Sequence, residues 1–270
     1  MMTMDRPATF ALSTITFAGQ AARWRHEAMR SHDTPRLIHI TKGQGRITIA
    51  GLTGGYGPNN LIYIPPNTMY GMEVGPTVFA QILRLPNAED WPDVSFHLRL
   101  LDVVGQKELQ NLIEAIEREL QPGGDLRAAE CHIGLLNIYV ERQLRARRTD
   151  QPDPRRNSAA ARLVARYTTM IAQDFHSEKG VADYAAALDV TPTHLTRCCK
   201  QTCDRSALGL LNERVHYEAC QLLRDTNTPV KNIAARLGFQ SAAYFTRSFQ
   251  QKAGQTPSHF RKTHMRPQGA

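Results

Sequence analysis

The chain has 270 residues, of which 41% are hydrophobic and 21% are charged, and this balance is typical of an ordinary globular protein. No stretch reaches the roughly 18 apolar residues that a membrane-spanning helix needs, and residues 1–10 lack the basic and apolar regions of a signal peptide. The five cysteines are too few and too closely spaced for a disulfide framework. These features predict a cytoplasmic protein without membrane segments.

The charge is distributed unevenly along the chain. Residues 1–154 contain 16 Lys and Arg against 17 Asp and Glu, whereas residues 155–270 contain 17 against 8. The formal net charge of +8 therefore lies entirely in the C-terminal part, and no acidic residue follows Asp225. This asymmetry predicts a polyanionic partner, either nucleic acid or an anionic membrane, and the alternative is a basic face that only contacts solvent.

The N-terminal part has the pattern of short β-strands. We expect strands where apolar and β-branched residues cluster, at 37–40, 47–49, 61–64 and 78–85. Segments rich in Gly, Pro and Asn separate them, at 42–45, 54–60 and 65–67. Together they predict a small antiparallel sandwich or barrel.

A helical period replaces this pattern between residues 106 and 148. The apolar residues that recur three or four positions apart are Leu109, Leu112, Ile113, Ile116 and Leu120, then Ala129, Ile133, Leu136, Val140 and Leu144. Pro122-Gly123-Gly124 interrupts the run, which predicts an antiparallel helical hairpin. Its apolar stripe either packs on the barrel or pairs with the same stripe of a second chain.

The segment 149–158 is polar, contains two prolines and is predicted to be an interdomain linker. Everything after it has a helical pattern. The predicted helix starts place a capping hydroxyl before a proline, at Thr191-Pro192, Thr228-Pro229 and Thr256-Pro257.

The C-terminal part contains a weak internal repeat. The positions i, i+3, i+4 and i+7 of one buried helical face are occupied twice, first by Val181, Tyr184, Ala185 and Leu188, then by Val230, Ile233, Ala234 and Leu237. A short turn through Asp189 or Gly238 follows, where a positive φ fits these residue types, and then a capped helix begins. Each copy is therefore predicted to be a helix-turn-helix unit.

The second helix of each unit separates its faces. Leu195, Cys198 and Cys199 point inward in one copy, and Phe245 and Phe249 in the other. The predicted outer faces, which offer hydroxyl, guanidinium and aromatic groups suited to a DNA major groove, carry Thr193, Thr196, Arg197, Lys200, Ala243, Tyr244, Thr246, Arg247 and Gln250. A hairpin of a packed bundle has the same apolar spacing, so the basic charge of this region is needed to favour DNA binding.

Residues 232–261 resemble the C-terminal signature of the AraC/XylS family of bacterial transcription regulators. The matching residues are Ile233, Ala234, Leu237, Gly238, Phe239, Phe245, Arg247, Phe249, Gly254, Pro257 and Arg261. The resemblance implies two helix-turn-helix units joined by a long helix, here 206–224, with both recognition helices in successive major grooves. It further implies base contacts from Thr193, Thr196 and Arg197 in the first unit, and from Ala243, Tyr244 and Arg247 in the second.

The first unit departs from the family pattern. Cys199 stands where an aromatic residue is usual, and Asp204 stands where a glycine is usual. A smaller core residue and a costlier turn predict a looser first unit. A metal or thiol switch built on Cys198, Cys199, Cys203 and His194 is one interpretation of the cysteines, and filling of the core is the other.

Two turns in the N-terminal part, 41–45 and 64–71, resemble the cupin-like effector domain of these regulators. Tyr70 stands where cupin enzymes have a metal-binding histidine, and His26, His32 and His39 lack a His-x-His spacing, so no metal or other cofactor is expected. The candidate effector contacts are Arg25, Arg36, His39, Tyr70, Met72, Phe79 and Gln81, which alternatively fill or rim the barrel. The two arginines favour an anionic ligand such as an organic acid.

The expected protein is an α+β multidomain chain with an N-terminal cupin-like β-barrel and helical hairpin, then an all-α domain of two helix-turn-helix units joined by a long helix. The expected parts are an effector-binding barrel at 1–105, a dimerisation hairpin at 106–148, a linker at 149–158 and a DNA-binding domain at 159–270. We expect a homodimeric, effector-responsive activator that binds promoter DNA and RNA polymerase and is not an enzyme. The alternatives are control by a protein partner, or a cupin-type metal enzyme fused to a DNA-binding domain.

Overall fold

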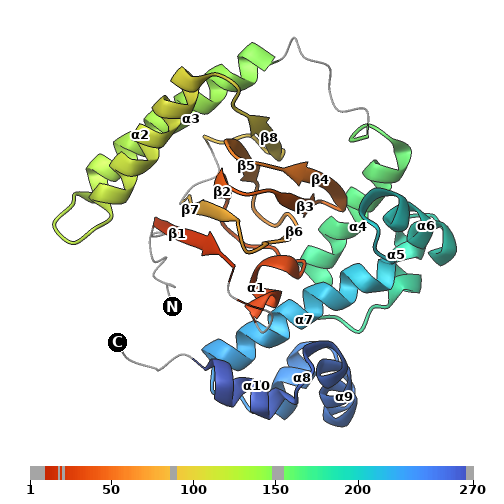
Figure 1. The fold of residues 1–270 in the computed structure, drawn as a ribbon. Coiled ribbons are helices and arrows are strands. Elements are labelled where there is room, and N and C mark those ends of the chain that lie inside the picture. Colours follow the sequence, from red (N-terminus) through yellow and green to blue (C-terminus); the bar gives the residue numbers. More distant parts are fainter. Residues whose placement is uncertain (1–9, 18, 20–21, 86–89, 148–154, 266–270) are drawn as a thin grey trace, which may run out of the picture.

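The computed structural model describes residues 10–17, 19, 22–85, 90–147 and 155–265, so most of the predicted linker, 149–154, lies outside the described residues. Figure 1 shows a β-barrel with a pair of long antiparallel helices along one side and an all-helical domain along the other. The fold is therefore the predicted α+β arrangement, with a β-rich N-terminal part and an all-helical C-terminal part.

Two antiparallel sheets form the barrel. The strands are β1 (Ala11–Thr16), β2 (Arg36–Lys42), β3 (Gly45–Ile49), β4 (Leu52–Tyr56), β5 (Asn60–Ile64), β6 (Tyr70–Met72), β7 (Phe79–Arg84) and β8 (Phe96–Arg99). The larger sheet has the order β1-β7-β2-β5-β8 and the smaller has β4-β3-β6. A cluster of buried aliphatic side chains together with Tyr56, Tyr70 and Met72 fills the space between the sheets.

The prediction of a turn over 54–60 is wrong in its first half. β4 continues to Tyr56, with Gly54 and Gly55 paired to Ile47 and Arg46 of β3. The second half holds, because a turn over 57–59 separates β4 from β5. A further reversal, between β3 and β4, lies at Ala50 and Gly51, whose φ angles are 48° and 74°. Glycines contribute no side chain to an alternating pattern, so the sequence gives no strand signal where two of them enter a ladder.

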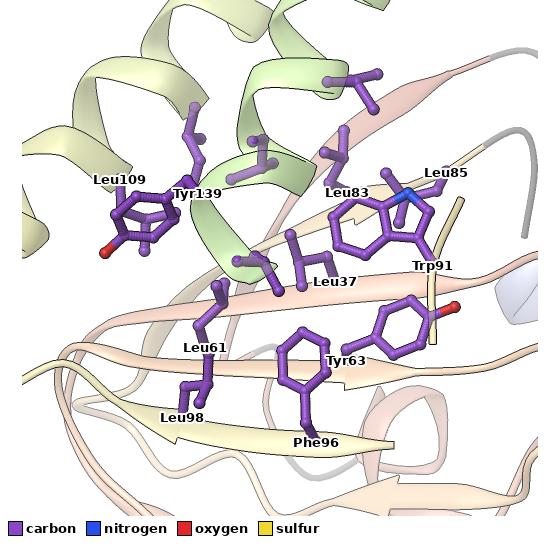
Figure 2. Close-up of a cluster of buried hydrophobic side chains, with 14 of the residues drawn as sticks. Leu37, Leu61, Tyr63, Leu83, Leu85, Trp91, Phe96, Leu98, Leu109 and Tyr139 are labelled. Carbon is purple, nitrogen blue, oxygen red and sulfur yellow. The ribbon is translucent and has the colours of Figure 1, made fainter. Parts of the chain in front are cut away.

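The helical hairpin packs on the larger sheet. α2 (Val103–Glu119) begins at Asp102, whose side chain accepts a hydrogen bond from the Gly105 N–H, and α3 (Leu126–Arg147) returns beside it. Figure 2 shows their inner faces against the barrel strands, where Leu109 and Tyr139 meet Leu37, Leu61 and other sheet residues. The apolar stripe is thus used within the chain, which is the first of the two alternatives for it.

Seven helices form the described part of the C-terminal domain, residues 155–265. They are α4 (Ala159–Asp174), α5 (Val181–Ala187), α6 (Pro192–Cys203), α7 (Ala207–Asp225), α8 (Val230–Arg236), α9 (Ala242–Ala253) and α10 (Pro257–His264). The first half of α7 belongs to one buried cluster, with α4, α5 and α6, and its second half to another, with α8, α9 and α10. The long helix therefore joins two separately packed units.

The predicted helix starts hold at two of three places. The Thr191 and Thr256 hydroxyls accept hydrogen bonds from the backbone N–H groups of His194 and His259. The prediction that Thr228 caps a helix is wrong. α8 begins one residue later, with Pro229 at the capping position and no side-chain cap. The Thr228 carbonyl instead accepts a hydrogen bond from the guanidinium of Arg261, which ties α10 to this turn.

The cysteines of α6 fill the core of the first unit. Cys198, Cys199 and Cys203 are buried and free. Burial raises the pKa of Cys199 to about 12, so its thiol stays protonated at neutral pH. Asp204 ends the helix in the left-handed region with φ 58°, where the second unit has Gly254 with φ 71°.

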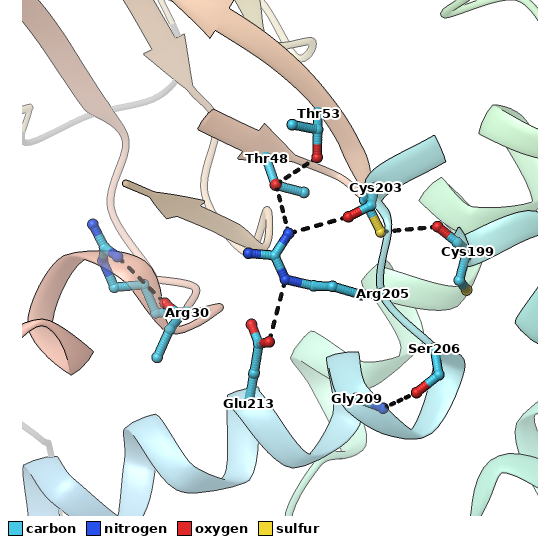
Figure 3. Close-up of polar contacts among 10 residues, drawn as sticks. Arg30, Thr48, Thr53, Cys199, Cys203, Arg205, Ser206, Gly209 and Glu213 are labelled. Atoms are coloured by element: carbon cyan, nitrogen blue, oxygen red, sulfur yellow. Dashed lines mark hydrogen bonds and ion pairs between the residues drawn. The ribbon is translucent and has the colours of Figure 1, made fainter. Parts of the chain in front are cut away.

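The barrel docks on the first unit through both apolar and polar contacts. Met29 and Met69 enter the buried cluster of α4, α5 and α6. Figure 3 shows Arg205, in the turn between α6 and α7, donating to the Thr48 hydroxyl of β3 at 3.0 Å while its Nε lies 3.2 Å from Glu213 Oε1. These contacts fix the position of α6 relative to the smaller sheet.

Candidate nucleic-acid interface and anion cleft

The two C-terminal units have the same backbone plan. In the first, α5 and α6 are joined through Asp189 with φ 56°, and in the second, α8 and α9 are joined through Gly238 with φ 77°. A Cβ atom at Gly238 would lie 2.7 Å from the Ser177 carbonyl oxygen, so only glycine permits this close approach between the units. Both turns have the positive φ that the sequence predicted.

The outer faces of α6 and α9 are open to solvent. Thr193, Arg197 and Lys200 are exposed on α6, with Thr196 half-buried. On α9 the exposed residues are Ala243, Tyr244, Arg247 and Gln250. Both helices therefore present exposed side chains with hydrogen-bonding groups, a hydroxyl, a guanidinium and an amine on α6 and a phenol, a guanidinium and an amide on α9.

Local contacts orient two of these side chains. The Arg197 guanidinium lies 3.1 Å from His194 Nδ1, one turn earlier on α6. Half-buried Thr246 donates its hydroxyl hydrogen to the Ala242 carbonyl of its own helix at 2.8 Å. The hydroxyl hydrogen of Thr246 is therefore used in a hydrogen bond within α9, whereas Arg247 on the same helix is exposed to solvent.

A second site lies between the barrel and the C-terminal domain. It is a cleft of about 300 Å³ whose walls come from β1, β2, β6, β7, α1 (Trp24–Glu27), the segment that follows α1, and one side chain of α7, Tyr217. Its basic lining residues are Arg25, His26, Arg30, His32, Arg36 and Arg84. No Asp or Glu is among the described residues that line it, so the cleft is strongly positive.

Arg30 is the most deeply placed of these cations, with 3% of its surface exposed. Its guanidinium donates to the carbonyl groups of His26 and Ala28 and lies 4.2 Å from the centre of the Tyr70 ring. Within the described part of the chain no carboxylate forms an ion pair with it. A buried arginine held only by carbonyls and a ring face retains capacity for an anion.

Arg36 has a comparable environment. It donates to the Thr34 hydroxyl at 2.6 Å and to the Pro35 carbonyl at 3.3 Å. Burial lowers the pKa of Arg36, so the protein does not fully compensate its charge.

The two histidines of the cleft are neutral at physiological pH. Burial, followed by the charges of Arg30 and Arg25, lowers the pKa of His26 to about 4. Burial and the charges of Arg36, Arg30 and Arg214 lower the pKa of His32 to about 3. An anion placed among these arginines would oppose their effect on both imidazoles.

The structure brings together only some of the predicted effector residues. Arg25, Arg36 and Tyr70 line the cleft. The others lie elsewhere: His39 and Met72 are buried, Phe79 is exposed beside Lys42, and Gln81 faces His39 on the neighbouring strand.

Sequence reasoning missed Arg30, His26, His32, Arg84 and Tyr217 as members of this cleft. The dense basic run at residues 23–30 was an available signal for Arg30. Tyr217 had none, because its helical spacing is that of a core residue.

Two further observations concern the described residues as a whole. No three or more His, Cys, Asp or Glu side chains come together there in an arrangement suited to a metal ion. None of the helices described combines the length and apolar character needed to cross a bilayer.

Two family models match the chain, and they match its two structural halves. One, described as a helix-turn-helix domain, covers residues 184–263, and the other, described as an AraC-like ligand binding domain, covers residues 14–136. The fold and these matches define a protein of two domains, a barrel of the AraC-like ligand-binding kind and a helix-turn-helix domain. The chain belongs to the AraC/XylS family of transcription regulators, as its signature residues predicted.

Curated relatives are similar to this chain over part of its length. The transcriptional activator RhaR of Mannheimia succiniciproducens is 25% identical over 157 residues, which are 57% of this chain and 54% of RhaR. The transcriptional regulator YfiF of Bacillus subtilis is 31% identical over 116 residues, which are 43% of this chain and 36% of YfiF. The chain thus matches about half or less of the length of these relatives.

The chain also matches two solved structures in part or in whole. The C-terminal domain of AraT, a response regulator from Geobacillus stearothermophilus, is 29% identical and matches 42% of this chain and 94% of that domain, with a TM-score of 0.40. ToxT from Vibrio cholerae is 9% identical and matches 95% of this chain and 97% of its own, with a TM-score of 0.46.

Proposed function

We propose that this regulator binds promoter DNA through α6 and α9 and is controlled by a small organic acid bound in the cleft between the barrel and α7. The DNA proposal rests on the exposed polar faces of two equivalent helices in the basic part of the chain. As in the family, the two helices enter successive major grooves. The effector proposal rests on one observation, the guanidinium groups of Arg30 and Arg36 in the cleft, whose hydrogen bonds in the described structure go to carbonyl and hydroxyl oxygens.

The chemistry of the cleft favours a carboxylate. Arginine binds carboxylates through paired N–H donors, and such charge-assisted hydrogen bonds are roughly twice as strong as neutral ones. The cleft of about 300 Å³ lies at the small end of ligand sites, so a compact acid fits better than a long one. Tyr70 and Tyr217 supply ring surface for the apolar part of such a molecule.

Calorimetry with matched pairs of compounds tests the effector proposal. Benzoate against benzamide, and hexanoate against hexanol, differ in charge while keeping similar apolar parts. We expect binding of the acids only, and an effect of the bound acid on affinity for DNA selected from random sequence by the purified protein. Binding of the neutral members alone would refute the anion cleft, and a DNA affinity that responds only to another protein would favour control by a partner.

A comparison of two basic residues tests the DNA proposal. Arg247→Ala should weaken binding to the selected DNA by about 5- to 150-fold and binding to random DNA much less, because a base contact contributes roughly 1–3 kcal/mol. Lys200 is proposed to contact a phosphate, so Lys200→Ala should weaken binding to selected DNA and to random DNA by similar factors. The slope of the logarithm of affinity against the logarithm of salt concentration should become shallower by about one. Equal losses on both DNAs for Arg247→Ala would refute base recognition by that residue.

We further propose a homodimer that forms through the outward face of the helical hairpin. Its inward stripe is occupied by the barrel, but the outward face has exposed apolar residues, with Leu135 at 52% and Ile138 at 47% exposure on α3 and Val104 at 78% on α2. Sedimentation should give a dimer that Ile138→Glu converts to a monomer. A wild-type monomer at all concentrations would refute this interface.

The remaining proposals concern the cell. The relative RhaR is named a transcriptional activator, and the same role, with contact to RNA polymerase, is proposed for this chain in the cytoplasm. We propose no catalytic activity. A purified protein that contained stoichiometric iron, zinc or manganese would instead favour the cupin-type metal enzyme.

A further inference from the structure

A continuous series of aromatic rings runs from the anion cleft into the second helix-turn-helix unit. It begins in the cleft, where Tyr70 and Tyr217 form part of the wall. The His32 ring lies between them, 5.9 Å from the centre of Tyr70 and 6.4 Å from that of Tyr217. These spacings are within the 4.5–7 Å at which aromatic rings interact.

The series continues through α1, which Figure 1 shows against α7. Trp24 lies 5.8 Å from Tyr217 and 5.8 Å from Phe260 of α10. Phe260 lies 5.4 Å from Phe249, and Phe249 5.9 Å from Phe245, both on the inner face of α9. The last two rings form the floor beneath the exposed face of the second recognition helix.

Trp24 is the member that connects the barrel to α10. It is half-buried, packs against the cluster of α8, α9 and α10, and comes directly before the cleft residues Arg25 and His26 in the chain. Its indole N–H is buried and has no hydrogen-bond partner in the described structure. Ring packing and the overlying guanidinium of Arg224, 5.6 Å away, therefore set its position, and no hydrogen bond opposes its movement.

We infer that Trp24 couples the anion cleft to α9, so that occupancy of the cleft changes the position of α9, the second recognition helix, within its unit. A ligand that contacts both Tyr217 and the barrel arginines binds best when α7 and the barrel are held together. Such a ligand shifts the protein toward that arrangement. Trp24 and Phe260 transmit the shift because close-packed rings move together. This inference rests on the proposed effector site, and coupling of this kind is reciprocal.

The two tryptophans of the chain provide a matched pair for the test. Trp91 stacks on Tyr63 at 5.3 Å in the core beneath α3, away from the series. We expect the carboxylate that binds tightest in calorimetry to change the affinity for selected DNA by 5-fold or more in wild type and in Trp91→Phe. In Trp24→Leu this factor should fall below 2, while the carboxylate affinity and the DNA affinity without carboxylate each stay within about 3-fold. An unchanged factor in Trp24→Leu would overturn the inference.

A second measurement separates this inference from the effector proposal. In Trp91→Phe, Trp24 is the only tryptophan, so its fluorescence reports the series directly. Selected DNA alone should change its emission, because coupling between α9 and Trp24 acts in both directions. If no carboxylate binds but DNA changes the emission, the effector proposal fails and the coupling stands. If DNA leaves the emission unchanged, the coupling is refuted whatever the cleft binds.

Discussion

Replacing Arg30 by Met separates binding of an anion from stability of the fold. In the structure Arg30 is 3% exposed, and its contacts are carbonyl oxygens and the Tyr70 ring. Removing one partner of a buried ion pair typically costs 3–5 kcal/mol, whereas removing a buried charge without a carboxylate partner relieves desolvation. Leaving the His26 and Ala28 carbonyls without this donor has the opposite effect. We therefore expect the two effects largely to cancel, so that Arg30→Met unfolds with a free energy within about 2 kcal/mol of wild type.

The same substitution should weaken the binding of the acid. A hydrogen bond to a charged group contributes about 1.5–3 kcal/mol, which corresponds to a dissociation constant about 10- to 150-fold higher. At a carboxylate concentration of 100 times the wild-type dissociation constant, wild type gains about 2.7 kcal/mol of stability. The variant should then gain only about 0.3–1.4 kcal/mol at that concentration.

Chemical unfolding with and without the acid measures both quantities. Arg99→Met is the matched control, because Arg99 is exposed on β8, away from the cleft, and should keep the full gain. An Arg30→Met protein with an undiminished gain would refute the role of Arg30 in anion binding. A loss of 3 kcal/mol or more without ligand would show that Arg30 has an essential structural partner.

Three further experiments test the packing and titration described above. Gly51→Ala places a Cβ 2.2 Å from Val164 Cγ1 and should lower the free energy of unfolding by about 2 kcal/mol or more. In a chain that already carries Val164→Ala, the loss caused by Gly51→Ala should be smaller in unfolding experiments. Lowering the pH from 7 to 5 should reduce the free energy of unfolding by about 2 kcal/mol for each of His26 and His32. Their pKa values of about 4 and 3 lie below the 6.5 of the unfolded chain, so the unfolded chain takes up the protons first. His26→Gln should remove the part of this loss that is due to His26. Leu136→Ala should cost about 2–5 kcal/mol in denaturant titration, since Leu136 is fully buried between α3 and the sheet, and a loss below 1 kcal/mol would contradict that packing.

The helices of the C-terminal domain could be predicted because their signals are local. Capping hydroxyls at Thr191 and Thr256, the positive-φ positions Asp189 and Gly238, and the inward Phe245 are each determined within one helical turn or its boundary. Such interactions depend on neighbours in the sequence, so a pattern of residue types is enough to place them.

The cleft could be predicted only in part because it is assembled from distant segments. Tyr217 reaches it from α7 by the docking of two domains, and its spacing in the sequence is that of any buried helical residue. Met72 was predicted to face a ligand because alternation in a strand shows which residues point inward. That alternation does not show whether neighbouring side chains fill the interior, as they do around Met72.

The net charge of residues 1–154 likewise gave no indication of the cleft. Residues 1–154 sum to −1, yet they supply the four arginines of the cleft, while many of their described carboxylates lie on the exposed faces of α2 and α3. The chain therefore has two positive surfaces with different exposure, the open faces of α6 and α9 and the cleft around buried Arg30. Salt screens exposed charges more than buried ones, so rising ionic strength should weaken DNA binding steeply and carboxylate binding much less. A coupled decline of both affinities with equal slopes would mean that the acid binds at the DNA-reading faces, and the regulation would then be direct competition for DNA.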